Sequence, residues 1–509
     1  MDIDGRLVVS PWVVGRDLPP DIQKHLRPSG RPRVDIRERK AIQSLSTPSR
    51  VVSPTGTANI PVILINFSDR TTIYTAANFN TLLFGTGNNS MKDYYQEISY
   101  GVFSVSAGPG GVVGWYTAAN GHDYYGQNDA GGNDRWPGDL VYEAVAAADG
   151  AGFDFAPYDQ DGDCYVDVVN IIHQGSGEEA GGPATDIWSH RWSLNGALFW
   201  GYSHYGAYTT NDPCPGGGNI IANDYVIQPE TLWGGQQTTG VFAHEYGHAL
   251  GLPDLYDTDG SSEGIGDWSL MAVGSWNSVT VAGDRPAHMD AWCKYALGWA
   301  TLTQVTGTLT SESITQAATA ADVYQLLSGS PSTGGECFLV ENRQNTGFDA
   351  GLPGEDLLIW HIDESVTTNR NECYPGGPSC ASQHYHVALV QADNLWDLEM
   401  NINRGDSGDP YYSPANTSFA GASSPNSNLY NGSASNVSVT NISTNGSTMT
   451  ADLSSSGGIN SDTIGLFNPT SGTFYLRDSN SAGYAYYTFR YGPAGGGWIP
   501  IVGDWDGLP

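Results

Sequence analysis

Two histidines and a glutamate carry the strongest chemical signal in the sequence. His244 and His248 stand four residues apart in the run HEYGH, and on a helix such residues share one face, where both imidazoles can bind one metal ion. Neutral imidazole is a good zinc ligand. Glu245 follows the first histidine and can reach a water molecule activated by the zinc, so we expect it to act as the general base. The pattern predicts a zinc hydrolase.

The residues after the second histidine offer a third ligand. Gly251 and then Asp254 follow His248 at intervals of three residues. A glycine here lets the chain leave the helix through a turn with positive φ, and Pro253 prevents the helix from continuing. The chain can then turn back so that Asp254 supplies an oxygen ligand. A catalytic zinc site needs three protein ligands and one open position, and this arrangement provides them.

Other nearby residues are candidates for alternative or supporting roles. Asp257 and Glu263 lie close enough in sequence to replace Asp254 as the third ligand. Met271, in the run SLMAVGSW, is expected in a tight turn that forms the floor of the site, although a lone methionine is by default a core residue. Tyr256 and nearby aromatic residues are candidates for stabilising an oxyanion. The sequence leaves these alternatives open.

An aspartate-rich segment indicates a second metal site. Carboxylates alternate with small residues in the run DQDGDCYVD, and oxygen-rich loops of this kind suit a hard cation such as calcium. The four aspartates are Asp159, Asp161, Asp163 and Asp167. No glutamate closes a twelve-residue EF-hand pattern, so the alternative is an acidic turn that binds no ion. We favour a structural calcium site. The runs 403–409 and 503–507 are weaker versions, typical of plain turns.

Helices and strands must position these residues. We expect the two histidines on a helix that begins near Thr238 or Thr239 and ends near Leu250. Further helices are expected after Asn89 or Ser90, over 138–150 and over about 287–297. Apolar and aromatic runs predict strands at 61–69, 165–173, 186–192, 197–210 and 223–230, and a hairpin formed by 101–108 and 111–116.

Changes of pattern along the chain predict four parts. Residues 1–55, rich in proline and arginine, are expected to be a leader or prosegment. Residues 56–300 are expected to form a mixed α/β catalytic domain. Residues 301–455 alternate short β-like runs with turns, which favours a sandwich-like, β-rich accessory domain. Residues 456–509 are expected to be a C-terminal β-repeat unit that is truncated. The predicted fold class is therefore α+β.

The charge balance excludes several partners. The 509 residues include 21 Lys and Arg against 54 Asp and Glu, a formal charge of −33. Nucleic acids and anionic membranes require a basic face, so we expect no nucleic acid partner. No run approaches the roughly 18 apolar residues of a membrane span. The sequence indicates no particular oligomeric state.

Basic residues are concentrated near the N-terminus. Ten of the 21 lie in residues 1–50, beside six acidic residues, so this stretch is basic and the rest strongly acidic. The leader can therefore bind the body in cis and keep it latent, while the alternative is a solvated, protease-sensitive leader. Exposed basic residues predict its removal near Arg39, Lys40 or Arg50.

Cysteine usage bears on the compartment. Six cysteines allow three disulfides, and Cys373 and Cys380, which enclose a short Pro- and Gly-containing loop, are the best candidate pair. The lack of a CxxC pair argues against a thiolate zinc site. The first residues lack the charged and apolar regions of a secretory signal, yet the composition favours export. We therefore expect an extracellular protein.

The quoted motifs resemble a known family. The runs 244–257, 268–276 and 286–299, with weaker likeness elsewhere over about 56–415, are similar to the immune inhibitor A family of secreted bacterial metallopeptidases, in the metzincin-like group. The resemblance implies a metzincin-like catalytic domain and zinc-dependent endopeptidase activity on protein and peptide substrates. It also implies that His244, His248 and Asp254 bind zinc and that Glu245 is the catalytic base.

Two other functions remain as rivals. The first is a non-catalytic extracellular adhesin or binding protein with a degenerate peptidase domain. The intact Glu245 argues against it, because loss of that residue would be the expected mark of degeneration. A zinc hydrolase acting on non-peptide amides is the weaker second rival.

Overall fold

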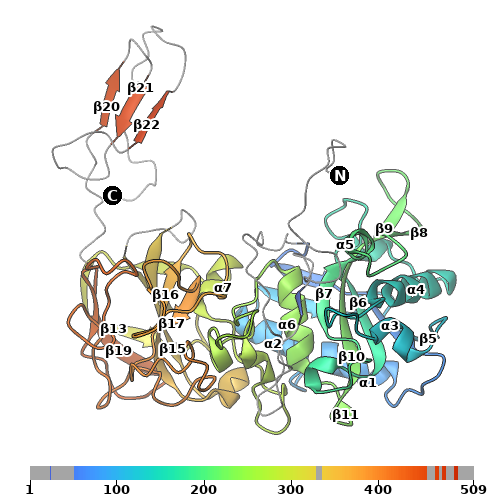
Figure 1. Cartoon of the computed structure of the whole chain (residues 1–509), viewed down its shortest axis with the longest axis horizontal. Coiled ribbons are helices and arrows are strands. Elements are labelled where there is room, and N and C mark those ends of the chain that lie inside the picture. The colour runs from blue at the N-terminus through green and yellow to red at the C-terminus, as the bar shows by residue number, and fades with distance from the viewer. Residues whose placement is uncertain are drawn as a thin grey trace.

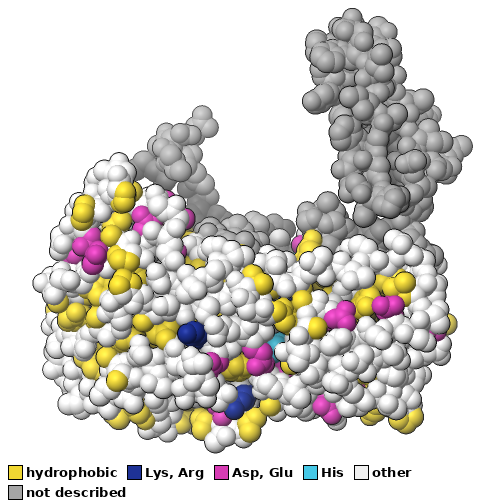
Figure 2. All heavy atoms as spheres, turned by 180° about the vertical axis from the view of Figure 1, so that it is seen from behind, with side chains coloured by type: hydrophobic (Ala, Val, Ile, Leu, Met, Phe, Trp, Pro, Cys, Tyr) yellow, Lys and Arg dark blue, Asp and Glu magenta, His cyan; other side chains and the backbone are white. Residues whose placement is uncertain are grey.

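The computed structural model describes residues 51–327 and 335–455, and beyond them only the backbone of four short strands. Helices and sheets are both present along the described chain, as the α+β prediction requires (Figure 1). None of the described helices is long and apolar enough to cross a membrane. Lys and Arg side chains are sparse on the face drawn in Figure 2, in keeping with the negative net charge.

A seven-stranded sheet organises the N-terminal part of the molecule. β3, β5, β6 and β10 run parallel to one another, whereas β7 pairs antiparallel with β10. β3 and β6 are almost completely buried, as expected for parallel strands covered on both faces. In spatial order the strands are β1 (Gln23–Lys24), β7 (His190–Ser193), β10 (Asp224–Leu232), β6 (Val169–Ser176), β3 (Val62–Asn66) and β5 (Val112–Thr117), with β11 (Gly235–Gln236) beside β10.

Helices cover both faces of this sheet. Alternate side chains of β3 divide between them, because successive strand residues point to opposite faces: Val62 and Leu64 pack with α2 and α6, and Ile63 and Ile65 pack with α4 and α5. Every residue of α6 is buried, so it is a central helix. The helices are α1 (Ala76–Phe84), α2 (Met91–Ile98), α3 (His122–Gly126), α4 (Pro137–Gly150), α5 (Leu194–Trp200), α6 (Thr239–Ala249) and α7 (Ala291–Ala296).

Several local predictions are confirmed. Ser90 is the N-cap of α2, and its hydroxyl accepts a hydrogen bond from the Asp93 amide. α4 ends at Gly150, and α6 begins after Thr238. The expected strand at 223–230 corresponds to β10.

Two predictions of strand structure are wrong. The runs 101–108 and 111–116 do not form a hairpin, because β4 (Phe103–Ser106) pairs parallel with β2 (Gly56–Asn59) and β5 pairs parallel with β3. Residues 197–210 are not one strand, because α5 occupies their first part and β8 (Tyr208–Pro213) follows, paired with β9 (Asn219–Ala222). The Ser193 hydroxyl caps α5, and Gly201 ends it in the left-handed region. These two caps outweigh the β propensity of the aromatic residues between them.

The region after residue 300 is rich in strands. A five-stranded sheet faces a three-stranded one, and Phe338, Val340 and Ile359 of the first pack against Ile314 and Met449 of the second. In spatial order the larger sheet contains β12 (Leu302–Gln304), β14 (Val323–Leu326), β15 (Glu336–Arg343), β16 (Asp356–Asp363) and β17 (Val387–Leu389). The smaller sheet contains β13 (Gly307–Thr315), β19 (Thr448–Ser455) and β18 (Val437–Thr440).

The hydrophobic core is continuous across residue 300. The other face of the five-stranded sheet, with Leu339 and Trp360, belongs to the same buried cluster as Trp268, Met271 and Tyr246 of the N-terminal part. α6 therefore lies between the two large sheets (Figure 1). The two regions are joined by packing as well as by chain connection.

The disulfide predicted between Cys373 and Cys380 is confirmed, and Cys164 pairs with Cys214. Cys293 and Cys337 are buried and form no disulfide. β20 (Gly465–Asn468), β21 (Thr473–Leu476) and β22 (Tyr487–Arg490) form an antiparallel sheet within the predicted C-terminal unit. Arg39, Lys40, Arg50 and the run 503–507 lie outside the described residues.

Candidate metal centre

The two histidines of α6 both direct their Nε2 atoms toward the Asp254 carboxylate. The His244 Nδ1–H donates to the Leu270 carbonyl at 2.8 Å, and the His248 Nδ1–H donates to the Leu252 carbonyl at 2.9 Å. Since a carbonyl only accepts, Nδ1 carries the proton in both rings and Nε2 keeps a lone pair. The two Nε2 atoms lie 3.2 Å from the same oxygen, Asp254 Oδ1.

The end of α6 brings Asp254 back to the histidines. Gly251 has a φ of 94°, in the left-handed region that glycine adopts easily. Its amide donates to the His248 carbonyl at 3.0 Å, and the Leu252 amide donates to the Gly247 carbonyl at 3.1 Å. These bonds close the helix and reverse the chain.

The donor set fits a zinc ion. His244, His248 and Asp254 place one ligand atom each within 4.8 Å of one another. The two histidine side chains are fully buried and that of Asp254 is 9% exposed, and the His248 Nε2 atom has no hydrogen-bond partner of good geometry. Two imidazole nitrogens and one carboxylate oxygen match the ligand chemistry and count of a catalytic zinc site.

The surroundings shift the pKa values of these ligands. Burial lowers the pKa of His244, which favours its neutral form. Burial opposes ionisation of Asp254, but the positive charge and hydrogen bonds that His248 and His244 provide when they are protonated outweigh it and lower the pKa of that carboxyl to about 2. Neutral imidazoles and an ionised carboxylate are the protonation states that a metal requires.

Glu245 and Tyr256 complete the surroundings. Burial raises the pKa of Glu245 well above its ordinary value, and the negative charges of Asp254 and Glu179 raise it further. The Tyr256 ring is stacked against the His244 ring with 6.3 Å between centroids. Burial and the charges of Asp254 and Glu245 also raise the pKa of Tyr256, so its hydroxyl stays protonated and can donate.

Residues 60–300 match the family model described as the catalytic domain of immune inhibitor A peptidase M6. This stretch, a little under half of the chain, is therefore similar to the catalytic domain of that family. The resemblance noted in the runs 244–257 and 268–276 is thereby confirmed, and the matched region is referred to below as the M6 domain.

Two curated relatives carry metal-peptidase or family names. The chain is 38% identical over 229 residues to Immune inhibitor A of Bacillus thuringiensis subsp. alesti, a match that covers 40% of this chain and 31% of the relative. It is 36% identical over 253 residues to Pre-pro-metalloprotease PrtV of Vibrio cholerae serotype O1, covering 44% of this chain and 26% of the relative. The chain thus matches about a third or less of each relative's length.

Met271 of the M6 domain packs under the histidines. Its side chain is fully buried, and a Cβ built on Gly247 would lie 2.5 Å from Met271 Sδ. Gly247 stands on α6 between the two histidines, so the methionine contacts the helix directly at the metal centre. The Met271 carbonyl accepts the Leu255 amide at 2.8 Å, next to Asp254 in the chain.

The two alternative ligands of the M6 domain are engaged elsewhere. Asp257 accepts hydrogen bonds from Ser261 and Ser262 at 2.7 to 2.9 Å. Glu263 forms an ion pair with Arg404 at 3.1 Å. The structure brings Asp254, and neither of these residues, to the two histidines.

Sequence reasoning missed Glu179 of the M6 domain. Its side chain is fully buried and accepts hydrogen bonds from the Ser189 hydroxyl at 2.8 Å and the Ser189 amide at 3.1 Å. Burial raises the pKa of Glu179 to about 7. The only signal was a pair of acidic residues shortly after an apolar strand, in the run QGSGEE. That run gives no indication that the carboxyl turns inward.

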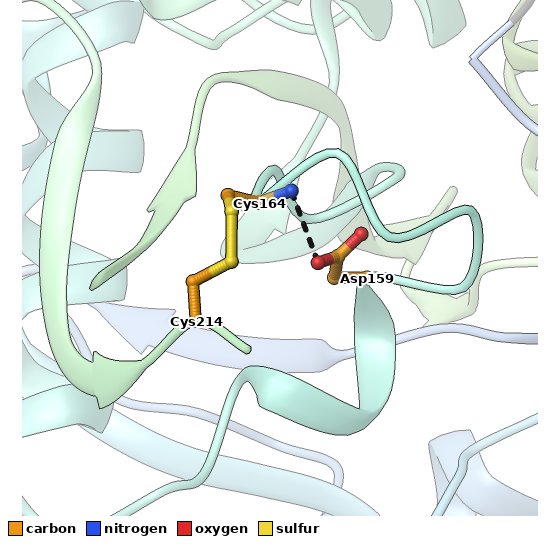
Figure 3. A group of neighbouring side chains, drawn as sticks. All are labelled: Asp159, Cys164 and Cys214. Atoms are coloured by element: carbon orange, nitrogen blue, oxygen red, sulfur yellow. Dashed lines mark hydrogen bonds between the residues drawn. A yellow bond between two sulfur atoms is a disulfide. The ribbon is translucent and has the colours of Figure 1, made fainter. Parts of the chain in front are cut away.

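Three of the four aspartates proposed for calcium converge. Asp159, Asp161 and Asp167 each place an oxygen within 4.8 Å of the others, whereas Asp163 is not in this group. Burial and the charges of Asp161 and Asp159 raise the pKa of Asp167 to about 7. The Cys164–Cys214 disulfide anchors the loop, and the Cys164 amide donates to Asp159 at 3.1 Å (Figure 3).

Proposed function

We propose that the chain is a zinc-dependent endopeptidase that hydrolyses peptide bonds in proteins. One observation carries the proposal: in a domain that matches the peptidase M6 family, two imidazole nitrogens and the Asp254 carboxylate converge beside a buried glutamate. His244, His248 and Asp254 would hold the metal ion. Zinc bound there supplies Lewis-acid polarisation of a carbonyl and a lowered pKa of water.

Glu245 moves the proton in this proposal. Its carboxylate takes a proton from the attacking water and returns it to the leaving amine. The raised pKa supports this role, because a buried carboxyl holds the proton between the two transfers. The Tyr256 hydroxyl donates toward the oxygen on which negative charge develops.

The central experiment compares wild-type protein with two variants in casein hydrolysis, with bound zinc measured in each. Glu245→Gln keeps the shape of the side chain but removes the base, so we expect activity to fall by at least about 100-fold while zinc is retained. Asp254→Asn is expected to lose zinc and activity together, because a neutral amide replaces the ionised ligand.

A matched control tests for general damage. Asp149→Asn changes another buried carboxyl, on α4, which covers the opposite face of the seven-stranded sheet from α6, and should leave hydrolysis unchanged. Zinc binding without hydrolysis, both in the wild type and after removal of the leader, would contradict the peptidase proposal and favour the non-catalytic binding protein. Hydrolysis that survives Glu245→Gln would exclude Glu245 as the base.

The leader is proposed to act in cis. β1 of the leader adds to the edge of the sheet of the M6 domain, with Gln23 opposite Arg191 and Lys24 opposite His190. This pairing supports a prosegment that covers β7 until it is removed.

A structural calcium ion is proposed for the loop that holds Asp159, Asp161 and Asp167. Three carboxylates that face one another repel unless a cation neutralises them, as the raised pKa of Asp167 indicates. Calcium is expected to raise the melting temperature of the wild type more than that of Asp161→Asn. An equal rise in both proteins would exclude this loop as the site.

An extracellular location is proposed as well. Two disulfides support it, since such bonds persist mainly in oxidising compartments. Detection of the protein only in the cell fraction of the producing organism would contradict this location.

A further inference from the structure

The segment that follows α6 contributes Asp254 to the metal centre. Hydrogen bonds from the β-rich region after residue 300 hold this segment in place. Leu255, the neighbour of Asp254, has both of its peptide groups bonded. Its amide donates to the Met271 carbonyl at 2.8 Å, and its carbonyl accepts the Ile265 amide at 3.1 Å. The same carbonyl accepts a second hydrogen bond, at 2.9 Å, from the side chain of Asn369.

Asn369 connects this carbonyl to the five-stranded sheet. Its side chain is 1% exposed. Its second N–H donates to the Val387 carbonyl at 2.7 Å, and its Oδ1 accepts the Val387 amide at 3.1 Å. Val387 is the first residue of β17, so a fully bonded amide joins the strand at the sheet edge to the residue beside Asp254.

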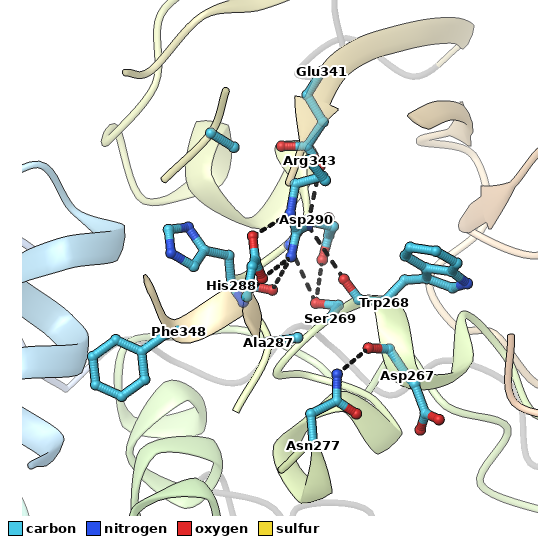
Figure 4. Close-up of polar contacts among 12 residues, drawn as sticks. Asp267, Trp268, Ser269, Asn277, Ala287, His288, Asp290, Glu341, Arg343 and Phe348 are labelled. Atoms are coloured by element: carbon cyan, nitrogen blue, oxygen red, sulfur yellow. Dashed lines mark hydrogen bonds and ion pairs between the residues drawn. The ribbon is translucent and has the colours of Figure 1, made fainter. Parts of the chain in front are cut away.

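Arg343, on β15, makes a second connection. This fully buried guanidinium donates to the Trp268 carbonyl at 3.3 Å and to the His288 carbonyl at 3.4 Å (Figure 4). It is held by a two-pronged ion pair with Asp349 at 2.6 and 2.7 Å, and Asp349 accepts the His288 amide at 2.8 Å.

This second connection also ends at a metal ligand. The Leu270 amide donates to the His288 carbonyl at 3.4 Å, and the Leu270 carbonyl accepts the Nδ1–H of His244 at 2.8 Å. Groups that orient metal ligands commonly lie one or two hydrogen bonds away from them. Here both chains of bonds start in residues 335–455.

We propose that Asn369 is a positioning residue for the metal centre, and that the β-rich region forms part of the metal-binding unit with Arg343 as its second anchor. The inference rests on the proposed zinc site but adds to it. Asn369 fixes the Leu255 carbonyl, one peptide beyond Asp254, so the carboxylate meets the two histidines without having to be ordered when the metal binds. Without that bond the turn after α6 is freer, and ordering it opposes metal binding.

The test measures the zinc dissociation constant by competition with a chelator. Asn369→Ala is compared with Asn342→Ala, a control matched in residue type, burial and bonding. Asn342 is fully buried and donates to the Ile314 and Gly446 carbonyls, both at 3.0 Å, so all of these contacts stay within residues 301–455. Its side chain lies on the opposite face of β15 from Arg343.

We expect Asn369→Ala to weaken zinc binding by about tenfold, within the range found for groups that orient metal ligands, while Asn342→Ala changes it less than about twofold. Both variants should melt below the wild type. If Asn369→Ala does not fold, Asn369→Ser, which keeps a polar side chain too short to bridge both carbonyls, takes its place. Equal zinc affinity in the Asn369 and Asn342 variants would overturn the inference alone. Absence of zinc binding in the wild type would overturn the proposed function with it.

Discussion

At the scale of single residues, backbone carbonyls decide which nitrogen of each histidine faces the metal centre. The Leu270 and Leu252 carbonyls take the Nδ1 protons of His244 and His248. Carboxylates often make this bond in metal proteins, and there they raise the basicity of the ligand. Here the negative charge at the centre comes from Asp254, whose pKa is lowered, whereas burial raises the pKa of Glu245 and favours its neutral form.

A single buried carboxyl gives a pH dependence that can be measured. Burial raises the pKa of Glu399 to about 8, although Gln391 donates to it at 2.6 Å. The folded state therefore keeps a proton that the unfolded state releases near pH 4.5. Stability from this group is complete below that pH and is lost as the pH rises toward 8.

The variant Glu399→Gln tests this prediction, because an amide of the same shape does not titrate. Melting temperatures measured from pH 5 to pH 9 should fall less in the variant than in the wild type. Parallel curves for the two proteins would show that Glu399 is ionised throughout this range.

At the scale of elements, α6 is fitted to the turn beneath it. Alanine is normally favoured over glycine inside a helix by about 1 kcal/mol. A Cβ on Gly247 would nevertheless lie 2.5 Å from Met271 Sδ and 3.3 Å from its methyl group. The steric conflict should outweigh the helix preference, since overpacking a core costs about 1–3 kcal/mol.

We therefore expect Gly247→Ala to lower the free energy of unfolding by about 1 kcal/mol, the middle of the net range, and to reduce hydrolysis. Gly150→Ala is the control, because a Cβ on Gly150, at the end of α4, meets nothing within 4 Å. Denaturant unfolding of both variants measures the difference. A stabilised Gly247→Ala protein would show that Met271 can move away freely.

The elements also show what the sequence could predict. The spacing of His244, Glu245 and His248 on one helix is local information, and so are the caps Ser90 and Thr238. Strand pairing is not local, because β4 and β5 are adjacent in sequence yet pair with different partners. The contacts of Glu179 and Asn369 could not be predicted from the sequence for the same reason, since each residue bonds to residues whose position depends on the whole fold.

At the scale of the whole molecule, the M6 domain and the β-rich region share one core. Trp268 of the first donates its indole N–H to Asp409 of the second at 3.0 Å, and the Asp267 amide donates to the Arg404 carbonyl at 2.7 Å. The boundary expected at residue 300 therefore marks a change in secondary structure, but the hydrophobic core continues across it. As proposed for Asn369, the position of the metal ligand Asp254 depends on contacts made by both regions.

The leader is the third part of the molecule that bears on function. Removal of residues 1–50 should increase hydrolysis of casein at unchanged zinc content, because it uncovers the edge of β7 that pairs with β1. This removal keeps Val51 and Val52, whose amides donate to the Ala249 carbonyl. Activity and zinc are measured before and after removal. Equal activity in the two forms would show that β1 is no obstacle to substrate.

The pairing of β1 with β7 has a consequence for the choice of targets. A strand edge offers backbone amides and carbonyls, which every polypeptide can match if it is extended. Such an edge would select polypeptides by their conformation and hardly at all by their amino-acid sequence. If the chain is the proposed peptidase, loosely structured segments of a protein would be cut readily, while compact domains of similar composition would escape. Under the proposed function, resistance to hydrolysis would then be a property of how firmly a target is folded.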